Sequence, residues 1–104
     1  MPLIIAYIPC SNDREAEKIS KNLLKKRIIA CANIIKAKSL YFWKGSIVDG
    51  HESIIIAKSD KKKSKKIIEE VKRTHSYKLP CIEIIDSKAN KEYEQWVKKT
   101  VSAR

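Results

Sequence analysis

Residues 31–48, CANIIKAKSLYFWKGSIV, are followed by Asp49-Gly50 and then by ESIIIAKS at residues 52–59. Both runs are rich in β-branched and aromatic residues, which favour strands. An Asp-Gly pair between two such runs is a strong signal for a two-residue hairpin turn. The sequence therefore predicts a long β-hairpin that turns at Asp49 and Gly50.

Shorter patterned segments flank this hairpin on both sides. LIIAYI at residues 3–8 is an uninterrupted apolar run between two prolines, which predicts a buried central strand. Asn12 and Glu15 have the spacing of a capping box, and apolar residues then recur at helical spacing as far as residue 28. The remaining predicted elements are a helix within residues 61–75 that Ser59 or Asp60 caps, a strand at residues 81–86 and a helix at residues 90–100.

The predicted order is strand, helix, strand, strand, helix, strand, with one further helix at the end. Two β-α-β units interleave in this way in the ferredoxin-like α+β sandwich, which carries its helices on one face of the sheet. We expect the spatial strand order 4-1-3-2 with antiparallel neighbours throughout. A chain of 104 residues predicts one domain, residues 1–104, with a core of its own.

Basic residues dominate the charge of the chain. There are 23 Lys and Arg residues against 12 Asp and Glu residues, a formal net charge of +11. Such a surface attracts polyanions, although a lysine-rich composition is also typical of proteins in which the charge serves solubility alone. Lys61, Lys62 and Lys63 stand at the positive end of the predicted second helix, where they form either a solvated run or an anion site.

The cysteines and the first residues bear on the compartment. Cys10, Cys31 and Cys81 are an odd number and form no CxxC pair. The opening MPLIIAYIPC has neither the basic segment nor the longer apolar run of a secretory signal. No apolar run approaches the roughly 18 residues of a membrane helix. We therefore expect a reduced, cytoplasmic protein without a membrane span.

LYFWKG at residues 40–45 brings three of the seven aromatic residues together. Bases stack on aromatic side chains, and the RNA-recognition motif has the topology predicted here. That motif places its stacking aromatics on its first and third strands, whereas the third strand here has none and the first offers only Tyr7. Nucleic acid is therefore not the expected partner, and a basic nucleic-acid-binding module is kept as an alternative.

The length of the hairpin indicates another role for these aromatics. The hairpin overhangs the shorter first and fourth strands, and two helices cannot cover the overhang. Tyr41, Phe42 and Trp43 then lie beside exposed strand edges, with Tyr41 and Trp43 on one face. Pairing with another copy removes both the apolar exposure and the open edges. We expect a closed homo-oligomer with the aromatic cluster in its interface.

Short motifs in order along nearly the whole chain resemble the CutA divalent-cation tolerance proteins. IACANI at residues 29–34 looks like the family stretch A-A-C-x-N-I, and SLYFWKG at residues 39–45 matches S-x-Y-x-W-x-G. HSYKLP at residues 75–80 is similar to H-P-Y-x-x-P, and YEQW at residues 93–96 matches Y-x-x-W. The resemblance implies a ferredoxin-like fold related to the PII signalling proteins, a homotrimer joined by strand pairing, and binding of divalent metal, especially copper. It implies no catalytic activity.

Cysteine and histidine are the candidate metal ligands. In the predicted topology Cys10 ends the first strand and Cys81 begins the fourth, so both lie at the end of the sheet that His75 approaches. Thiol and imidazole groups suit Cu(I), Cu(II) or Zn(II). We take Cys10 and His75 as candidate ligands of weakly bound copper or another divalent cation. The alternative is a buried thiol that packs as an apolar group and a histidine that hydrogen-bonds a loop; Cys31 is expected in the core.

A second group of candidates lies near the subunit boundaries of the expected trimer. It forms either an inter-subunit pocket for a small molecule or ion, or a polar interface network. Its members are Tyr41, Trp43, Glu52, Lys58 and Tyr77. No catalytic triad, phosphate loop or paired-carboxylate motif appears, so no enzyme activity is expected. The predicted function is a trimeric cytoplasmic divalent-cation-binding protein of metal-ion tolerance. The alternatives are a basic nucleic-acid-binding module and a PII-like signalling or scaffold protein.

Overall fold

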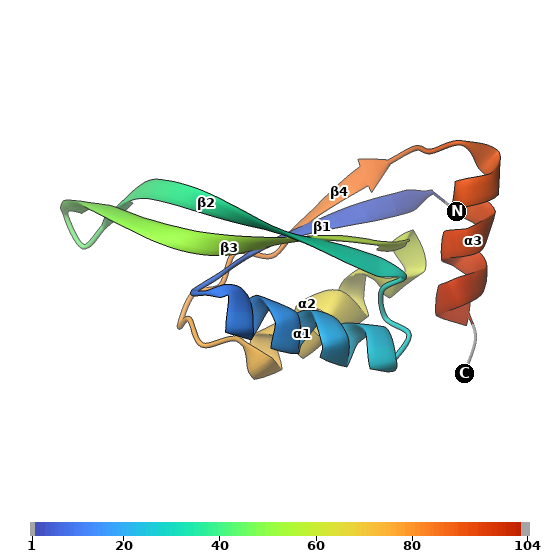
Figure 1. Ribbon diagram of the computed structural model, residues 1–104, viewed down its shortest axis with the longest axis horizontal. Helices are drawn as coiled ribbons and strands as arrows, with labels where there is room; N and C mark the ends of the chain where they lie inside the picture. Colours follow the sequence, from blue (N-terminus) through green and yellow to red (C-terminus); the bar gives the residue numbers. More distant parts are fainter. Residues whose placement is uncertain (1, 103–104) are drawn as a thin grey trace.

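The computed structural model describes residues 2–102 and contains a sheet, two helices beneath it and a third helix across one end (Figure 1). No helix among these residues has both the length and the apolar character that crossing a membrane requires. The elements in chain order are β1 (Leu3–Cys10), α1 (Asp13–Lys25), β2 (Cys31–Trp43), β3 (Ser46–Asp60), the short 3-10 helix η1 (Lys61–Lys63), α2 (Ser64–Thr74), β4 (Glu83–Ser87) and α3 (Lys91–Ser102).

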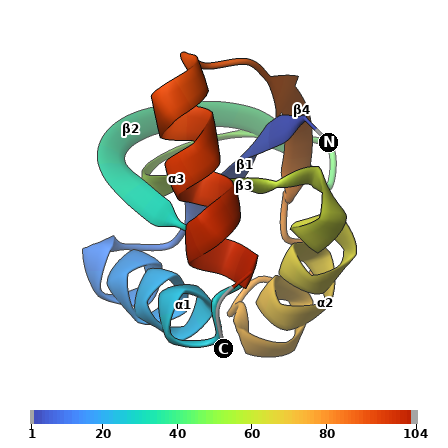
Figure 2. The ribbon, with the colours of Figure 1, turned by 90° about the vertical axis from the view of Figure 1, so that its right-hand side faces the viewer.

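The sheet has the strand order β2-β3-β1-β4, and every neighbouring pair is antiparallel. This is the order expected from the sequence, so the predicted ferredoxin-like α+β fold with an additional C-terminal helix is confirmed. α1 and α2 lie side by side on one face of the sheet (Figures 1 and 2). The apolar run of β1 is central because it pairs with β3 on one side and β4 on the other.

The core lies between the sheet and the two helices. Ile4 and Ile8 of β1 point toward the helices and are fully buried together with Ile55 of β3. Leu23 of α1 and Ile67 of α2 close the core from below, each on the apolar stripe of its helix. Full burial of one such side chain contributes about 1.5–3 kcal/mol, so this layer is the main stabilising feature of the fold.

α3 closes the end of the sheet where β1 and β2 begin (Figure 2). Its Val97 and Val101 are buried against Leu3 and Ala30, with Tyr93 packed beside them. The rest of the sheet face turned away from α1 and α2 is less covered: Ile35 is 49% exposed and Ile85 is 47% exposed. A strip of apolar side chains therefore faces outward along this side.

The hairpin turn lies at Lys44 and Gly45, so the prediction of a turn at Asp49-Gly50 is wrong. Trp43 pairs with Ser46, and both turn residues have positive φ, 50° at Lys44 and 81° at Gly45. Positive φ at both central positions is the geometry of a type I′ turn, which suits the twist of a two-stranded ribbon.

The register of β2 against β3 explains why the turn does not form at Asp49-Gly50. Cys31 pairs with Lys58, and the ladder continues unbroken to the turn. A turn five residues later would shift every pair, so that residues 31–38 would face residues 61–68, which form η1 and the start of α2. Asp49 and Gly50 instead continue β3, opposite Leu40 and Ser39. A turn at Asp49-Gly50 would place Trp43 opposite Ile56, whereas Trp43 pairs with Ser46 and Ile56 with Asn33.

The hairpin extends beyond the sheet as an arm, as its length predicted. β1 reaches only as far as the pair Cys10 and Ser53, so residues 46–52 of β3 pair with β2 alone. The molecule is 45 Å long, and the arm forms its free end in Figure 1. The apolar side chains on the arm are exposed: Leu40 66%, Tyr41 48%, Phe42 75%, Trp43 45% and Ile47 73%.

Candidate functional site

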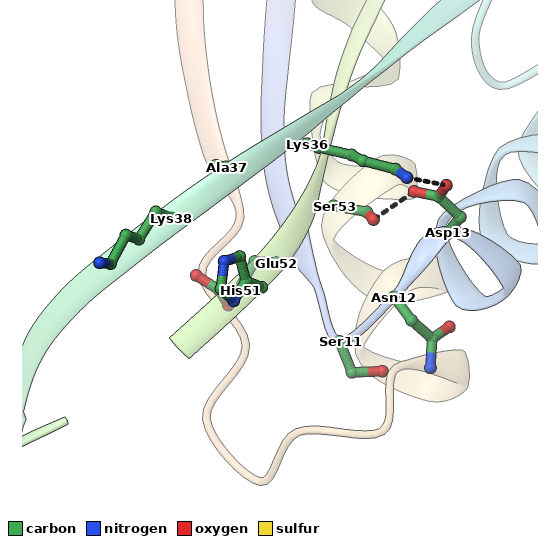
Figure 3. Close-up of a pocket in the computed structure, with 9 residues that line it drawn as sticks. All are labelled: Ser11, Asn12, Asp13, Lys36, Ala37, Lys38, His51, Glu52 and Ser53. Carbon is green, nitrogen blue, oxygen red and sulfur yellow. Dashed lines mark hydrogen bonds and ion pairs between the residues drawn. The ribbon is translucent and has the colours of Figure 1, made fainter. Parts of the chain in front are cut away.

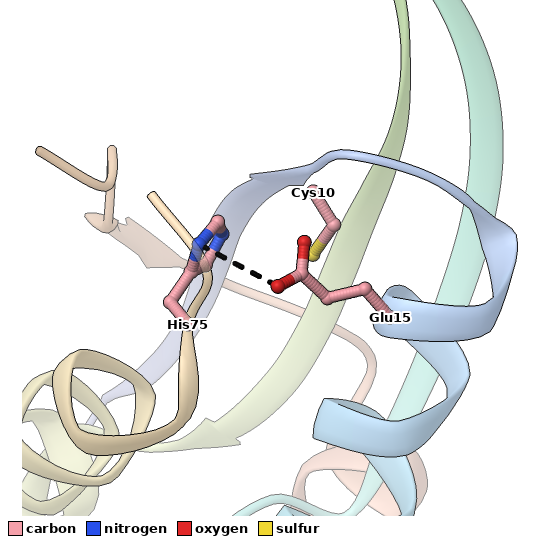
Figure 4. Close-up of side chains that lie close together, drawn as sticks. All are labelled: Cys10, Glu15 and His75. Carbon is pink, nitrogen blue, oxygen red and sulfur yellow. Dashed lines mark ion pairs between the residues drawn. The ribbon is translucent and has the colours of Figure 1, made fainter. Parts of the chain in front are cut away.

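Cys10, Glu15 and His75 converge where β1 meets α1 (Figure 4). One ligand atom from each lies within 4.8 Å of the other two. Within residues 2–102 no other group of three or more Cys, His, Asp or Glu side chains comes this close together. The sequence predicts Cys10 and His75 as metal ligands, and the structure brings them together. Glu15 is expected from the sequence only as part of the helix cap.

The first turn of α1 brings Glu15 to this position. Asn12 caps the helix, because its side chain accepts a hydrogen bond of 2.9 Å from the backbone N–H of Glu15. The Glu15 carboxylate turns back as in a capping box, but it accepts from the backbone N–H and the hydroxyl of Ser11, both at 2.9 Å. Its other oxygen accepts from the backbone N–H of Ser76 at 2.8 Å.

These hydrogen bonds decide the charge of Glu15. Burial alone raises the pKa of the carboxyl group, but the hydrogen bonds from Ser11 and Ser76 outweigh burial and lower the pKa to about 2. Glu15 is therefore a carboxylate at neutral pH. It joins the β1–α1 connection to the segment that follows α2, which is how His75 is held near Cys10.

His75 begins that segment, directly after α2, and its side chain is fully buried. The Nε2 atom lies 2.8 Å from the carbonyl oxygen of Pro9, and the Nδ1 atom accepts from the backbone N–H of Tyr77 at 3.1 Å. A carbonyl oxygen can only accept, so Nε2 carries the proton and Nδ1 presents a lone pair. The Tyr77 N–H occupies that lone pair, and the Oε2 atom of Glu15 lies 3.9 Å from Nδ1.

Cys10 is the third member of the cluster, and its side chain is fully buried. The thiol donates a long hydrogen bond of 3.6 Å to the carbonyl oxygen of Ile8. Burial is the largest influence on its pKa, and the charges of Glu15 and Glu52 add to it, so that the pKa rises to about 12. The group is therefore a protonated thiol at neutral pH.

The cluster offers sulfur, nitrogen and oxygen donors, a set that suits borderline cations such as Cu²⁺ and Zn²⁺ and their softer relative Cu⁺. The donor chemistry therefore fits the ions that the sequence suggested. Two of the three side chains must change before they can coordinate a cation. Cys10 has to lose its proton, and Nδ1 of His75 has to give up the N–H of Tyr77.

The other two cysteines lie outside this cluster. Cys81 is exposed and its sulfur donates to a Glu83 carboxylate oxygen 3.6 Å away. Cys31 is half-buried at the opposite end of the sheet, with its sulfur 3.1 Å from the Tyr93 hydroxyl oxygen. Lys58, a member of the second candidate group, also lies there, with its Nζ atom 5.8 Å from the centroid of the Tyr93 ring.

The remaining members of that second group surround one hollow. Its volume is about 730 Å³, and Tyr41, Trp43, Glu52 and Tyr77 are among the residues that line it. The Tyr77 hydroxyl donates to the Glu52 carboxylate at 2.8 Å. Burial and this hydrogen bond raise the pKa of Tyr77. The Tyr77 ring also lies 4.6 Å from the His75 ring, centroid to centroid, so the hollow adjoins the cluster.

A second hollow of about 550 Å³ lies on the helix side of the arm, at the start of α1 (Figure 3). Asp13 accepts a hydrogen bond from the Ser53 hydroxyl and lies 3.8 Å from Nζ of Lys36. His51 lines the same hollow, and it is exposed, as expected from the sequence. The other charged groups of its lining have partners outside the hollow: Lys38 lies 3.9 Å from Asp49, and Glu52 accepts from Tyr77.

Comparison with known proteins gives a consistent result. The sequence model of the family described as CutA1 divalent ion tolerance protein matches residues 4–100. The chain is 40% identical over 96 residues to the divalent-cation tolerance protein CutA of Archaeoglobus fulgidus, which covers 91% of this chain and 94% of that protein. It is 36% identical over 98 residues to the protein of the same name from Thermococcus kodakarensis, and the match covers 93% of this chain and 94% of that protein.

Solved structures agree with the sequence comparison. The structure of the Archaeoglobus fulgidus protein, described there as a periplasmic divalent cation tolerance protein, matches with a TM-score of 0.93 at 38% identity and covers 95% of this chain and 98% of that one. The structure of CutA1 from Oryza sativa matches with a TM-score of 0.92 at 25% identity, and the match covers 96% of this chain and 94% of that one.

Proposed function

This chain belongs to the CutA1 divalent ion tolerance protein family, and we propose that it is a homotrimer that binds a copper-type divalent cation reversibly. The cation is cargo in this proposal, and metal-ion tolerance is the role. The observation that carries it is the cluster of Cys10, Glu15 and His75, with one ligand atom from each within 4.8 Å.

The three residues have separate parts in this proposal. The Glu15 carboxylate is already charged and attracts the cation, and Nδ1 of His75 and the Cys10 sulfur complete the protein ligands. Because the pKa of Cys10 is raised to about 12, protons compete with the cation for the sulfur at neutral pH. Binding is therefore weak and readily reversed, which suits a protein that takes up and releases an ion.

The test is a titration of the full chain with Cu²⁺ and, separately, with Zn²⁺. Cys10→Ala and His75→Ala remove one ligand each, and we expect each to weaken binding at least about tenfold, the effect that even indirect disturbance of a metal site produces. Cys81→Ala and His51→Ala are matched controls, because they remove the same groups from exposed positions. Equal affinity in all five proteins would contradict the proposal.

The arm and the uncovered sheet face support the proposed trimer. Among residues 2–102, β2 is an edge strand of 13 residues whose outer edge pairs with no other strand, and its own Phe42 and Trp43 are 75% and 45% exposed. Such edges and apolar patches favour pairing with another chain. Pairing between different edges of identical chains closes into a ring when the rotation from one copy to the next permits it. Three copies is the number that the family resemblance implies.

In the proposed trimer a neighbouring chain covers the hollow beside the arm. Tyr41 and Trp43 form the apolar part of that interface, and Tyr77 with Glu52 forms the polar part. Lys58 meets a subunit boundary at the other end of the sheet, near α3. The hollow adjoins the metal cluster through Tyr77, so trimer assembly and ion access are linked.

The compartment and the organisation of the chain complete the proposal. Cys10, Cys31 and Cys81 are all free thiols, which is typical of a reducing cytoplasm, whereas the Archaeoglobus fulgidus relative is described as periplasmic. We also propose that residues 1–104 form a single domain and that the protein acts by binding rather than by catalysis.

A further inference from the structure

A hollow of about 470 Å³ lies at the opposite end of the molecule from the arm, between the beginning of α2 and the last turns of α3. In Figure 2, which views this end, α3 runs down beside α2. Five lysines from η1, α2 and α3 line the hollow: Lys62, Lys63, Lys66, Lys98 and Lys99.

The acidic groups near this hollow do not balance its charge. Asp60, the acidic residue in its lining, is only 4% exposed, and its carboxylate accepts a hydrogen bond of 3.1 Å from the backbone N–H of Lys62. Glu94 lies 3.9 Å from Nζ of Lys98, as a neighbour one turn away on α3. Among residues 2–102 no carboxylate lies within ion-pair distance of Nζ of Lys62, Lys66 or Lys99.

The start of α2 adds to this positive potential. The amino end of a helix carries a partial positive charge, which acidic side chains usually offset. α1 follows that rule, with Asp13 and Glu15 in its first turn. The Asp60 carboxylate caps η1, whereas α2 has neither a side-chain cap nor an acidic residue in its first turn. The positive charges of the lysines and of the amino end of α2 therefore meet in one concave site. The low-dielectric walls of such a site concentrate the positive potential.

We propose that this hollow binds a compact polyphosphate anion. Phosphate oxygens accept charge-assisted hydrogen bonds from lysine ammonium groups. A volume of about 470 Å³ is within the usual range for small-ligand sites. Two closely spaced phosphates can meet lysines from both helices at once, which one isolated surface lysine cannot do. The site is separate from the cation cluster and shares no residue with it.

An extended nucleic acid fits this hollow less well. Single strands bind where aromatic side chains stack with the bases along a basic groove. No aromatic residue lines the hollow, whose remaining lining residues are Val101 and Ser102. The aromatic cluster of the chain lies on the arm, at the far end of the molecule (Figure 1). The structure therefore favours a small anion of high charge density over an RNA strand.

The test is a calorimetric titration of the full chain with inorganic tripolyphosphate in metal-free buffer. The variant Lys62→Gln/Lys99→Gln removes one lysine from each side of the hollow, and both residues are exposed, so the core is untouched. Lys66→Gln/Lys98→Gln is a second variant of the same hollow. The control is Lys18→Gln/Lys25→Gln, which removes the same charge from exposed positions on α1.

We expect saturable binding at one site per chain, about tenfold or more weaker in both hollow variants and unchanged in the control. Affinity should also fall as salt is raised from about 50 to about 200 mM, because lysine–phosphate attraction is screened. An equal loss in the hollow variants and the control would show diffuse attraction and overturn the proposal. Absence of binding, or binding of single-stranded RNA but not of tripolyphosphate, would overturn it as well.

Discussion

The hydroxyl group of Tyr77 donates a hydrogen bond of 2.8 Å to the carboxylate of Glu52, 25 residues earlier in the chain. This contact joins the segment after α2 to β3 at the base of the arm. The same segment carries His75, whose Nδ1 atom accepts from the backbone N–H of Tyr77. The arm, the hollow beside it and the metal cluster are thus connected through one short segment.

Tyr77→Phe removes this contact while keeping the ring. The Glu52 carboxylate then loses its half-buried donor, and we expect the free energy of unfolding to fall by about 1–2 kcal/mol, the usual effect of losing a hydrogen bond to a charged group. The measurement is denaturant unfolding at a fixed protein concentration, because assembly changes apparent stability.

Tyr7→Phe is the matched control for this substitution. Tyr7 is half-buried on β1, and its hydroxyl has no hydrogen-bond partner among the described residues. We expect its unfolding free energy to stay within about 0.5 kcal/mol of the original value, as for substitutions that touch no specific interaction. Similar losses in both variants would refute the role given to the Tyr77–Glu52 bond.

Glu15→Gln tests the charge of the cluster through the pH dependence of stability. The pKa of Glu15 is lowered from 4.5 to about 2 in the folded chain, so its carboxylate stabilises the fold above pH 4.5 and this contribution is lost as the pH falls toward 2. At neutral pH we expect the substitution to reduce the unfolding free energy on the order of 2 kcal/mol. The difference from the original chain should shrink steadily between pH 4.5 and about 2.

Glu17→Gln provides the comparison, because Glu17 is exposed on the same helix, where its carboxylate lies 3.6 Å from Nζ of Lys21. Its effect should be below about 1 kcal/mol at every pH, as for other surface ion pairs. A pH-independent effect of Glu15→Gln would mean that the carboxylate charge does not contribute to stability.

Gly45→Ala tests the position of the hairpin turn. Gly45 has a φ of 81°, and an added Cβ would meet no atom within 4 Å, so the substitution acts on the backbone alone. A left-handed conformation costs about 1–2 kcal/mol for a residue with a side chain. We expect a loss of that size in the unfolding free energy.

Gly50→Ala is the corresponding control. Gly50 lies within β3, its φ is not positive, and its added Cβ also meets nothing within 4 Å. We expect little change or a slight gain in stability, since Ala restricts the unfolded chain more than Gly does. If Gly50→Ala lowered the free energy of unfolding more than Gly45→Ala, the hairpin turn would have to lie at Asp49-Gly50 instead.

Most of the local patterns in the sequence agree with the structure. The apolar run of β1, the cap at Asn12 and the alternation of helices with strands are each formed by neighbouring residues, and together they were enough to predict the strand order. The turn was not predictable in this way. Lys44-Gly45 and Asp49-Gly50 both offer a glycine, and only the distance from Cys31 to the end of β3 decides between them.

The candidate site was predicted in part for the same reason. Cys10 and His75 could be placed from the topology, because one ends the central strand and the other follows α2. Glu15 was assigned to the helix cap, and its second contact, with Ser76, joins residues 61 positions apart. One feature of the sequence could have placed Glu15 in the site. It lies five residues after Cys10, and a capping carboxylate at that position turns back toward the end of β1. Lys58 was grouped with Glu52 although it lies near Tyr93.

Trp43→Ala tests the assembly. Trp43 is 45% exposed on the arm, and we expect the substitution to shift a homotrimer toward single chains in sedimentation at micromolar concentration, because buried aromatic residues dominate interface energies. Leu24→Ala also removes a partly exposed apolar side chain, 37%, but from α1, away from both the arm and α3, and it should leave the mass unchanged. A stable single chain before any substitution would contradict the proposed trimer.

The most direct measurement of the central claim is an anomalous diffraction map, recorded at the zinc absorption edge, from crystals of the full chain soaked in Zn²⁺. The account predicts a peak between Cys10, Glu15 and His75, about 2.3 Å from the sulfur and about 2.0–2.1 Å from Nδ1. A map without that peak, whether empty or with zinc only at exposed groups such as Cys81 and His51, would contradict it.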